Sequence, residues 1–329
     1  MSSDEARNRP TPTHVVHYEG RELAVDVAGD PDAYPVFLMH GMPGSRIGPR
    51  PRSIVLYRLG VRLISYDRPG YGQSDRKRGR TVYDAGADVA AIANHLRLER
   101  YSVVGRSAGG PHALAAAAYD HRIRSAAVLV GAAPSDAEGL DWYEGMVESN
   151  QEAYTAADRQ VAEHAWNRDQ DAEQHEIGDL VENLRARAGE VSDNPESLIK
   201  TLGPDLTASD RRVIENAGLR ALLMDTYSEA VHGREAGGWV DDAIALRRGW
   251  GFKLNQVHCP VLLWHGMNDR FVPVGHTEWL ADQLRATRMD PDTVKVRLAA
   301  GMAHFGAVEI LPEVLGWLAK TATSAVPAR

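Results

Sequence analysis

The chain has 329 residues, of which 43% are hydrophobic and 25% charged, a composition typical of a globular protein with a buried core. Acidic residues outnumber basic ones by 45 to 37, and the net charge of −8 disfavours a nucleic-acid-binding protein. No apolar run approaches the roughly 18 residues that would span a bilayer, and Met1–Thr13 lacks the apolar segment of a secretory signal. Cys259 is the single cysteine, so no disulfide can form within the chain. We therefore expect a soluble, acidic, cytoplasmic protein of unknown oligomeric state.

Short strands alternate with helices in the first part of the chain. Val15–Tyr18 and Leu23–Ala28 are predicted to form a hairpin. The apolar runs that follow are typical of strands buried on both faces, and the segments between them show helical spacing of apolar residues. The predicted strands are Val36–Met39, Val61–Tyr66, Tyr101–Gly105 and Ser125–Val130, and the predicted helices are Val82–Leu96 and Gly109–Tyr119.

The pattern changes at Pro134. Residues 135–240 contain 23 acidic and 9 basic residues, a net charge of −14, and show helical rather than strand-like patterning. Alternation resumes with the strands Val261–His265 and Val294–Leu298 and the helices Val274–Leu284 and Phe305–Lys320. We predict an α/β fold with a mostly parallel, doubly wound sheet. Residues 1–134 and 241–329 would form its core, and residues 135–240 an α-helical cap over one edge of the sheet.

A candidate nucleophile lies between a predicted strand and a predicted helix. Gly105-Arg106-Ser107-Ala108-Gly109 matches the G-x-S-x-G pattern in the strand–turn–helix context that this pattern requires. A sharp turn of this kind would expose the Ser107 hydroxyl at the carboxyl end of the sheet, because glycines two positions away avoid steric collision. The sequence therefore predicts a serine nucleophile.

Serine needs a base that is itself oriented by a carboxylate. Asp269 follows the predicted strand Val261–His265, and His304 lies between the last strand and the last helix. The order serine, acid, histidine is the one that accompanies this type of turn. Asp136, which follows another strand, remains an alternative acid.

The third component of such a site is an oxyanion hole. His40-Gly41-Met42-Pro43-Gly44 follows the strand Val36–Met39, and the backbone N–H groups of Met42 and Ala108 are the predicted donors. Pro43 has no N–H to donate, and we expect His40 to be part of the scaffold. No phosphate-binding loop, dinucleotide fingerprint or zinc motif is present, and no cofactor is expected.

These motifs resemble those of α/β-hydrolase-fold enzymes with an inserted helical cap. The matching segments are residues 40–44, 67–74, 105–110, 265–269 and 301–304. The resemblance implies a serine hydrolase with Ser107 as nucleophile, His304 as base and Asp269 as its orienting acid, and Met42 and Ala108 as oxyanion donors. It implies a structural turn for residues 67–74. Haloalkane dehalogenases and epoxide hydrolases use an aspartate as nucleophile, so Ser107 argues against both.

The reaction expected from this resemblance is cleavage of a small carboxylic ester or a related acyl bond. The H-G-x-P-G segment resembles proline iminopeptidases, but Ala108 replaces the tryptophan that usually follows their nucleophile. A proline-iminopeptidase-like amidase, a non-hydrolytic lyase or cyclase, and a ligand receptor therefore remain alternatives.

Substrate contacts are expected from Arg106 and from the cap. Arg106 would meet a substrate carboxylate or form a structural ion pair. The net charge of −14 in the cap would disfavour anionic substrates unless it belongs to a solvated surface. The apolar cap candidates are Trp142, Tyr143, Met146, Trp166, Tyr227 and Trp239, of which Trp142, Met146 and Trp239 are the predicted substrate-binding residues.

Overall fold

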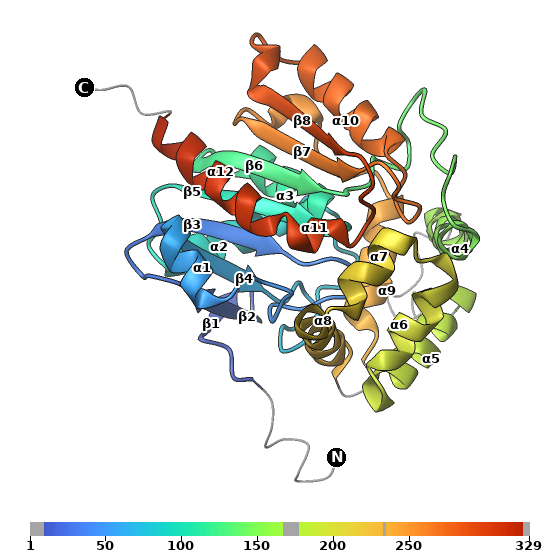
Figure 1. The fold of residues 1–329 in the computed structure, drawn as a ribbon. Helices are drawn as coiled ribbons and strands as arrows, with labels where there is room; N and C mark the ends of the chain where they lie inside the picture. The colour runs from blue at the N-terminus through green and yellow to red at the C-terminus, as the bar shows by residue number, and fades with distance from the viewer. Residues whose placement is uncertain (1–9, 167–177, 233–234, 325–329) are drawn as a thin grey trace.

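In a computed structural model, which describes residues 10–166, 178–232 and 235–324, the chain forms one twisted sheet with helices on both faces (Figure 1). The strand order is β1-β2-β4-β3-β5-β6-β7-β8. β1 and β2 form an antiparallel hairpin, and β2 pairs antiparallel with β4. The strands from β3 to β8 all run parallel to one another. The strands are β1 His14–Tyr18, β2 Arg21–Ala28, β3 Tyr34–Met39, β4 Val61–Tyr66, β5 Tyr101–Arg106, β6 Ile123–Leu129, β7 Val261–Gly266 and β8 Val294–Ala299. The predicted α/β class with a mostly parallel, doubly wound sheet is therefore confirmed.

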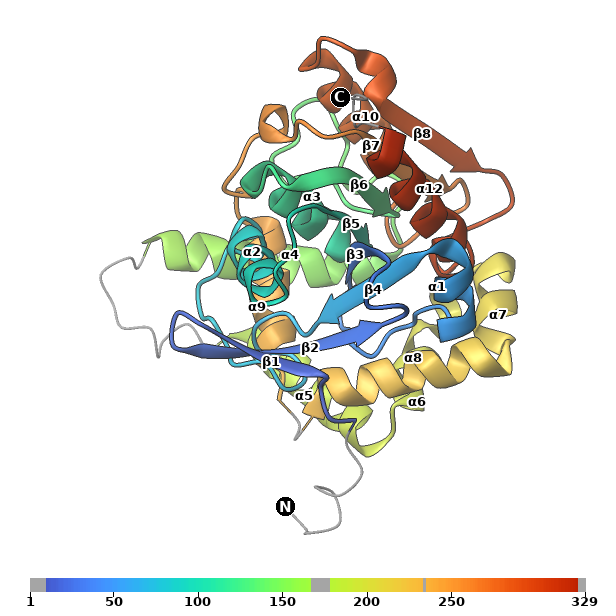
Figure 2. The same ribbon diagram turned by 90° about the vertical axis from the view of Figure 1, so that its left-hand side faces the viewer.

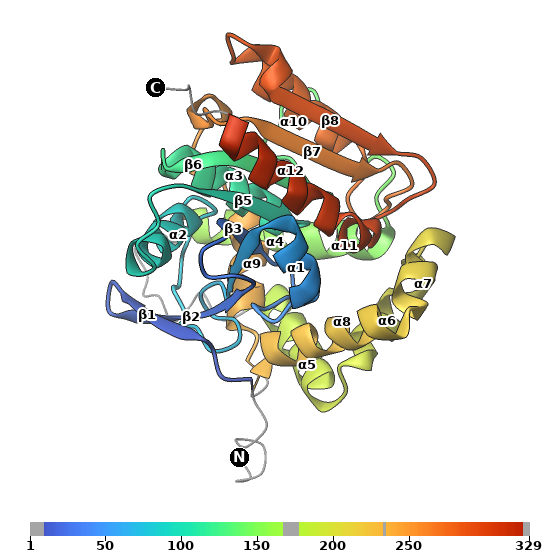
Figure 3. The ribbon, with the colours of Figure 1, turned by 60° about the vertical axis from the view of Figure 1, so that its left-hand side comes forward.

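The apolar strands are buried on both faces because helices cover each side. Val36 and Leu38 of β3 pack with α12, while Phe37 and Met39 point to the opposite core, so alternate residues serve two layers. Helices α2, α3 and α10 cover one face of the sheet, and α1 and α12 lie side by side on the other (Figure 3). The helices of these layers are α1 Ser53–Leu59, α2 Asp84–His95, α3 Gly109–Tyr119, α10 Gly275–Ala286, α11 Gly306–Glu309 and α12 Leu311–Ser324.

Two helices differ from the sequence expectation. Helix α1 was not predicted, because it is only seven residues long and Leu56 is its single buried residue. The helix predicted over Phe305–Lys320 is divided into α11 and α12. Pro312 has no backbone N–H, which the first turn of a helix does not require, so it is tolerated at the start of α12. The same proline prevents a continuous helix from α11 into α12.

A helical segment lies between β6 and β7, as the sequence predicted. The described residues of this segment form α4 Glu148–Trp166, α5 Asp179–Asp193, α6 Glu196–Leu202, α7 Ala208–Glu215, α8 Ala217–Ala230 and α9 Gly237–Arg247. In Figure 1 these helices gather beyond the arrowheads of β3, β6 and β7, at the carboxyl ends of the parallel strands. They share their own apolar cluster, which includes Leu184, Val213 and Tyr227. The predicted boundary at residue 240 falls within α9.

The edges of the sheet are far apart, with β1 and β2 at one end and β8 at the other (Figure 2). Short 3-10 helices occupy connections outside the sheet, at Gly203–Asp205, Leu254–Gln256 and Pro291–Thr293. Among the residues that the structure describes, no helix combines the length and apolarity needed to cross a membrane.

Candidate active site

Ser107 occupies a sharp turn between β5 and α3. Its φ is +53°, in the left-handed region that favours glycine, and its N–H donates to the carbonyl of Leu129 at 2.8 Å. The neighbouring glycines leave no room for a side chain. A Cβ on Gly105 would lie 2.0 Å from the Gly109 carbonyl oxygen, and one on Gly109 would lie 2.3 Å from the Met39 carbonyl oxygen. The strained turn is thus held by close backbone packing.

Asp269 and His304 are joined by a hydrogen bond. The Nδ1–H of His304 donates to Oδ2 of Asp269 at 2.8 Å, and Oδ1 of the same carboxylate accepts the backbone N–H groups of Phe271 and Val272 at 2.8 and 3.0 Å. Asp136, the alternative acid, is exposed in the loop after β6. The structure therefore brings Asp269, and not Asp136, to the histidine.

The environment of Asp269 favours its ionised form. Burial alone would raise the pKa of this carboxyl group, but the neighbouring His304 and His265 outweigh burial and hold the pKa well below its usual range. The Nε2 atom of His265 lies 3.4 Å from Oδ2 of Asp269. A carboxylate that stays charged can keep the proton of His304 on Nδ1, which leaves Nε2 free to accept another proton.

Ser107 and His304 line the same cavity, which has a volume of about 170 Å³. Gly41 and Met42 from the loop after β3 border it beside Ala108. Among the described residues, no hydrogen bond joins the Ser107 hydroxyl to His304, although the Nε2 atom of His304 has no other partner. Catalytic hydrogen bonds are often long before substrate binds, so this separation is compatible with proton transfer.

The predicted oxyanion donors border this cavity too. The backbone N–H groups of Met42 and Ala108 donate to no acceptor among the described residues, whereas the adjacent N–H of Ser107 is bonded within the sheet. Ala108 immediately precedes α3, so its N–H belongs to the positive end of that helix. Two N–H groups without partners beside a serine could stabilise a developing oxyanion.

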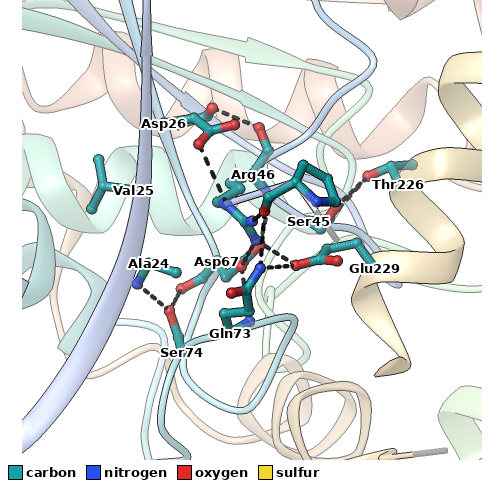
Figure 4. Close-up of polar contacts among 12 residues, drawn as sticks. Ala24, Val25, Asp26, Ser45, Arg46, Asp67, Gln73, Ser74, Thr226 and Glu229 are labelled. Carbon is teal, nitrogen blue, oxygen red and sulfur yellow. Dashed lines mark hydrogen bonds and ion pairs between the residues drawn. The ribbon is translucent and has the colours of Figure 1, made fainter. Parts of the chain in front are cut away.

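A buried ion-pair network holds the loop that carries Met42 (Figure 4). Nη1 of Arg46 lies 2.5 Å from Asp67 and 2.6 Å from Glu229 of α8, and the backbone N–H of Arg46 also donates to Asp67. Ser45 contacts Thr226 of the same helix. These bonds join the loop to the strand β4 and to the helical segment, so they fix where the Met42 N–H lies.

His40 is part of the same scaffold, as expected. Its Nδ1 donates to the Gly41 carbonyl at 2.8 Å, and its Nε2 accepts the backbone N–H of Arg68 at 3.1 Å. Burial lowers the pKa of His40 well below its usual value, with the Arg68 guanidinium acting in the same direction. Arg68 in turn donates to the carbonyls of His40 and Gly41 and pairs with buried Asp242 of α9. The turn at residues 67–74 therefore has a structural role.

The structure divides the predicted substrate-binding residues. Arg106 and Trp239 line the cavity, as does Tyr227. Trp142 and Met146 were predicted to do so, but they do not: they pack together in a separate buried cluster, where the indole N–H of Trp142 donates to the carbonyls of Ala133 and Pro134. Sequence alone could not distinguish apolar residues that fill a core from those that line a cavity. Tyr143 packs against this cluster, and the side chain of Trp166 lies outside the described residues.

Several cavity-lining residues were not anticipated. Phe271 and Phe305 border the cavity, and their positions close to Asp269 and His304 in the sequence could have indicated this. Tyr154 of α4 and Arg187 of α5 also line it. No motif marks these two residues, because helix packing alone brings them there.

The comparisons with known proteins agree with this architecture. A strand-to-helix turn that carries Ser107 and the Asp269–His304 pair follow parallel strands of the sheet. The model of the α/β hydrolase fold family matches residues 34–308, and the chain belongs to that family.

Its relatives bear the names of an esterase, a lactonase, haloperoxidases and proline iminopeptidases. The chain is 28% identical over 228 residues to a pimeloyl-[acyl-carrier protein] methyl ester esterase of Nitrosomonas europaea. The aligned residues cover 69% of this chain and 75% of that protein. It is 29% identical over 100 residues to 3-oxoadipate enol-lactonase 1 of Acinetobacter baylyi, covering 30% of this chain and 37% of the relative, less than half its length.

Solved structures share the fold. The enol-lactonase of Burkholderia xenovorans superimposes with a TM-score of 0.62 at 18% identity, covering 94% of this chain and all of the other. A thermophilic esterase of Thermogutta terrifontis gives a TM-score of 0.61 at 21% identity, covering 94% and 98% of the two chains.

Proposed function

We propose that this protein is a serine hydrolase that cleaves a small-molecule carboxylic ester through an acyl-enzyme on Ser107. One observation carries the proposal: the Asp269–His304 hydrogen bond lies at the wall of the cavity that Ser107 also lines. A nucleophile on a strained turn, a base and a carboxylate that orients the base are the parts required for acyl transfer.

The proposed reaction has two steps. Nε2 of His304 accepts the proton of the Ser107 hydroxyl while the serine oxygen attacks the ester carbonyl. The N–H groups of Met42 and Ala108 bind the resulting oxyanion, and His304 returns the proton to the departing alcohol. Water, deprotonated by His304, then attacks the acyl-enzyme and releases the acid. Asp269 remains ionised throughout and stabilises the imidazolium.

The division into core and cap is also part of this proposal. Residues 1–134 and 241–329 form the catalytic core, and residues 135–240 form a cap, with α9 running across the second boundary. The cap supplies Tyr154, Leu184 and Tyr227 to the cavity that contains Ser107. A cytoplasmic location is proposed as well, which the single cysteine supports.

Ester cleavage is favoured over aminopeptidase activity by the charge of the cavity. An aminopeptidase must bind the free ammonium group of its substrate, and a carboxylate is the natural partner for that group. Among the described residues that line the cavity there is no aspartate or glutamate, whereas Arg106 and Arg187 are both present.

The proposal is tested by rapid-mixing kinetics with p-nitrophenyl acetate. We expect a burst of p-nitrophenol equal to the enzyme concentration, followed by slower turnover, and loss of both in Ser107→Ala. Ser53→Ala, which replaces an exposed serine at the start of α1, is the matched control and should behave as wild type. Turnover that persists in Ser107→Ala, or ligand binding with no turnover in the wild type, would contradict the proposal.

A further inference from the structure

Arg106, the residue immediately before Ser107, differs from the other arginines buried in the core. Arg46, Arg68 and Arg80 are fully buried, and each pairs with at least one carboxylate. The guanidinium of Arg106 forms no ion pair and no hydrogen bond with any of the described residues. The residue is partly buried and lines the cavity, and it also borders a second, smaller pocket. The structural ion pair that the sequence left open for Arg106 is therefore not formed.

The cavity offers this cation no counter-ion. Its other polar groups largely have protein partners: Ser149 donates to Asp205, Asn150 donates to the Phe271 carbonyl, and Thr201 donates to the Ser197 carbonyl. The hydroxyl group of Tyr227 has no hydrogen-bond partner among the described residues. Burial raises the pKa of Tyr227 to about 12, while the nearby Arg106 opposes this rise. A guanidinium and a phenol hydroxyl, both donors, therefore lie near each other in the same cavity.

An arginine in this setting is costly to the free protein. A partly buried cation without a counter-charge loses hydration that no protein group replaces. Burial accordingly lowers the pKa of Arg106 below its ordinary value. Arginine nevertheless stays protonated at neutral pH, since its pKa starts above about 12. An anionic molecule that enters the cavity would supply the missing counter-charge.

We propose that the substrate carries a carboxylate, which binds the Arg106 guanidinium and the Tyr227 hydroxyl while its ester carbonyl lies at Ser107. A guanidinium presents paired N–H donors that match the two oxygens of a carboxylate. Because Arg106 and Ser107 line one cavity of about 170 Å³, a short spacer should separate the carboxylate from the ester carbonyl. The substrate class is thus the half-ester, or the corresponding lactone acid, of a short dicarboxylic acid. This inference rests on the proposed hydrolase function and narrows it.

The negative charge of the cap does not oppose such a substrate. The net charge of −14 was expected to disfavour anions, but none of the acidic residues described in the cap lines the cavity. Asp205 is bonded to Ser149, which lines the cavity, and Asp158 is bonded to Arg247, so both carboxylates already have partners. Arg187 of α5 adds a second positive charge at the cavity.

The test compares esters that differ only in the charged group. Monomethyl succinate, glutarate and adipate are hydrolysed in parallel with methyl butanoate, pentanoate and hexanoate, in which a methyl group replaces the carboxylate, and methanol release is measured. We expect wild-type kcat/KM to favour the anionic member of at least one pair. Arg106→Met should lower that anion-to-neutral ratio by about 10- to 100-fold, the range for a hydrogen-bonded ion pair. Arg106→Lys should restore part of the ratio.

Arg58→Met is the matched control, because it removes one positive charge from the exposed end of α1, away from the cavity. It should leave the ratio as in the wild type. If Arg106→Met does not fold, inhibition of the wild type tests the inference. Glutarate should inhibit p-nitrophenyl acetate hydrolysis by the wild type more strongly than the uncharged pentanamide does.

A wild-type preference for the neutral ester at all three lengths, or an unchanged ratio in Arg106→Met, would overturn the inference. Ser107-dependent hydrolysis of the neutral esters would still support the proposed function, so the two failures are distinguishable.

Discussion

Replacing Asp269 by asparagine tests how the carboxylate controls the tautomer of His304. In the structure, Oδ1 of Asp269 accepts two backbone N–H groups, from Phe271 and Val272, while Oδ2 accepts the Nδ1–H of His304. Asparagine has a single acceptor oxygen, and the two backbone donors will hold that oxygen in the Oδ1 position. Its NH2 group must then face His304, because the reverse orientation would place NH2 against two N–H donors.

The consequence for His304 follows from this geometry. An NH2 group facing Nδ1 requires Nδ1 to be an acceptor, so the ring proton moves to Nε2. Nε2 is the atom that must accept the proton of Ser107, and in this tautomer it cannot. Loss of the correct tautomer in a serine triad costs about 10⁴ in kcat, which corresponds to about 5.5 kcal/mol of transition-state stabilisation.

We therefore expect Asp269→Asn to hydrolyse p-nitrophenyl acetate about 10⁴-fold more slowly than the wild type, with a similar thermal unfolding temperature. Asp136→Asn, in which an exposed acid is replaced, should retain wild-type activity. The reasoning is refuted if Asp269→Asn stays within tenfold of the wild type, or if Asp136→Asn shows the larger loss.

The remaining predictions concern the scaffold of the site. Gly109→Ala should lower the free energy of unfolding, measured in urea, by about 1–3 kcal/mol or more, because the new Cβ would collide with the backbone. Gly203→Ala, where a Cβ meets no neighbouring atom, is the control and should change stability by less than about 0.5 kcal/mol. Equal effects of the two substitutions would contradict this prediction. Arg46→Met removes the ion pairs that Arg46 forms with Asp67 and Glu229 and should cost about 3–5 kcal/mol in the same assay. A neutral effect would show that the network is dispensable. Burial lowers the pKa of His276 to about 4, below the 6.5 of an exposed histidine, so its stabilising contribution is complete above pH 6.5 and is lost as the pH falls towards 4. His276→Gln should therefore reduce the loss of stability between pH 7 and pH 5 by about 2 kcal/mol, and an unchanged pH dependence would count against a neutral buried imidazole.

Sequence patterns predicted the sheet because its strands are buried on both faces. Val36–Met39 is apolar throughout, and Val61–Tyr66 is apolar except at Arg62 and Ser65. β4 has the predicted bounds in the structure. Helix α3 was also predicted with its observed bounds, since the alanine-rich segment begins directly at the glycine turn. Helix α1 escaped prediction because a short exposed helix carries no periodic apolar signal.

The site divides along a similar physical line. Ser107, Asp269 and His304 follow strands whose carboxyl ends share one edge of the sheet, so chain order and local motif were enough to bring them together as a prediction. Which residues of α4 and α5 line the cavity depends on how the cap helices pack against one another, and no local sequence pattern encodes this packing. The free guanidinium of Arg106 is likewise invisible in the sequence, because only the fold shows that no carboxylate reaches it.

The most direct test of the account is to identify the residue that a fluorophosphonate modifies. We predict a single adduct per chain, located at Ser107 by peptide mass mapping, absent in Ser107→Ala and formed far more slowly in His304→Ala. A hydrolytically active enzyme that remains unmodified at Ser107, or that carries its adduct on another residue, would contradict the assignment of this serine as the nucleophile.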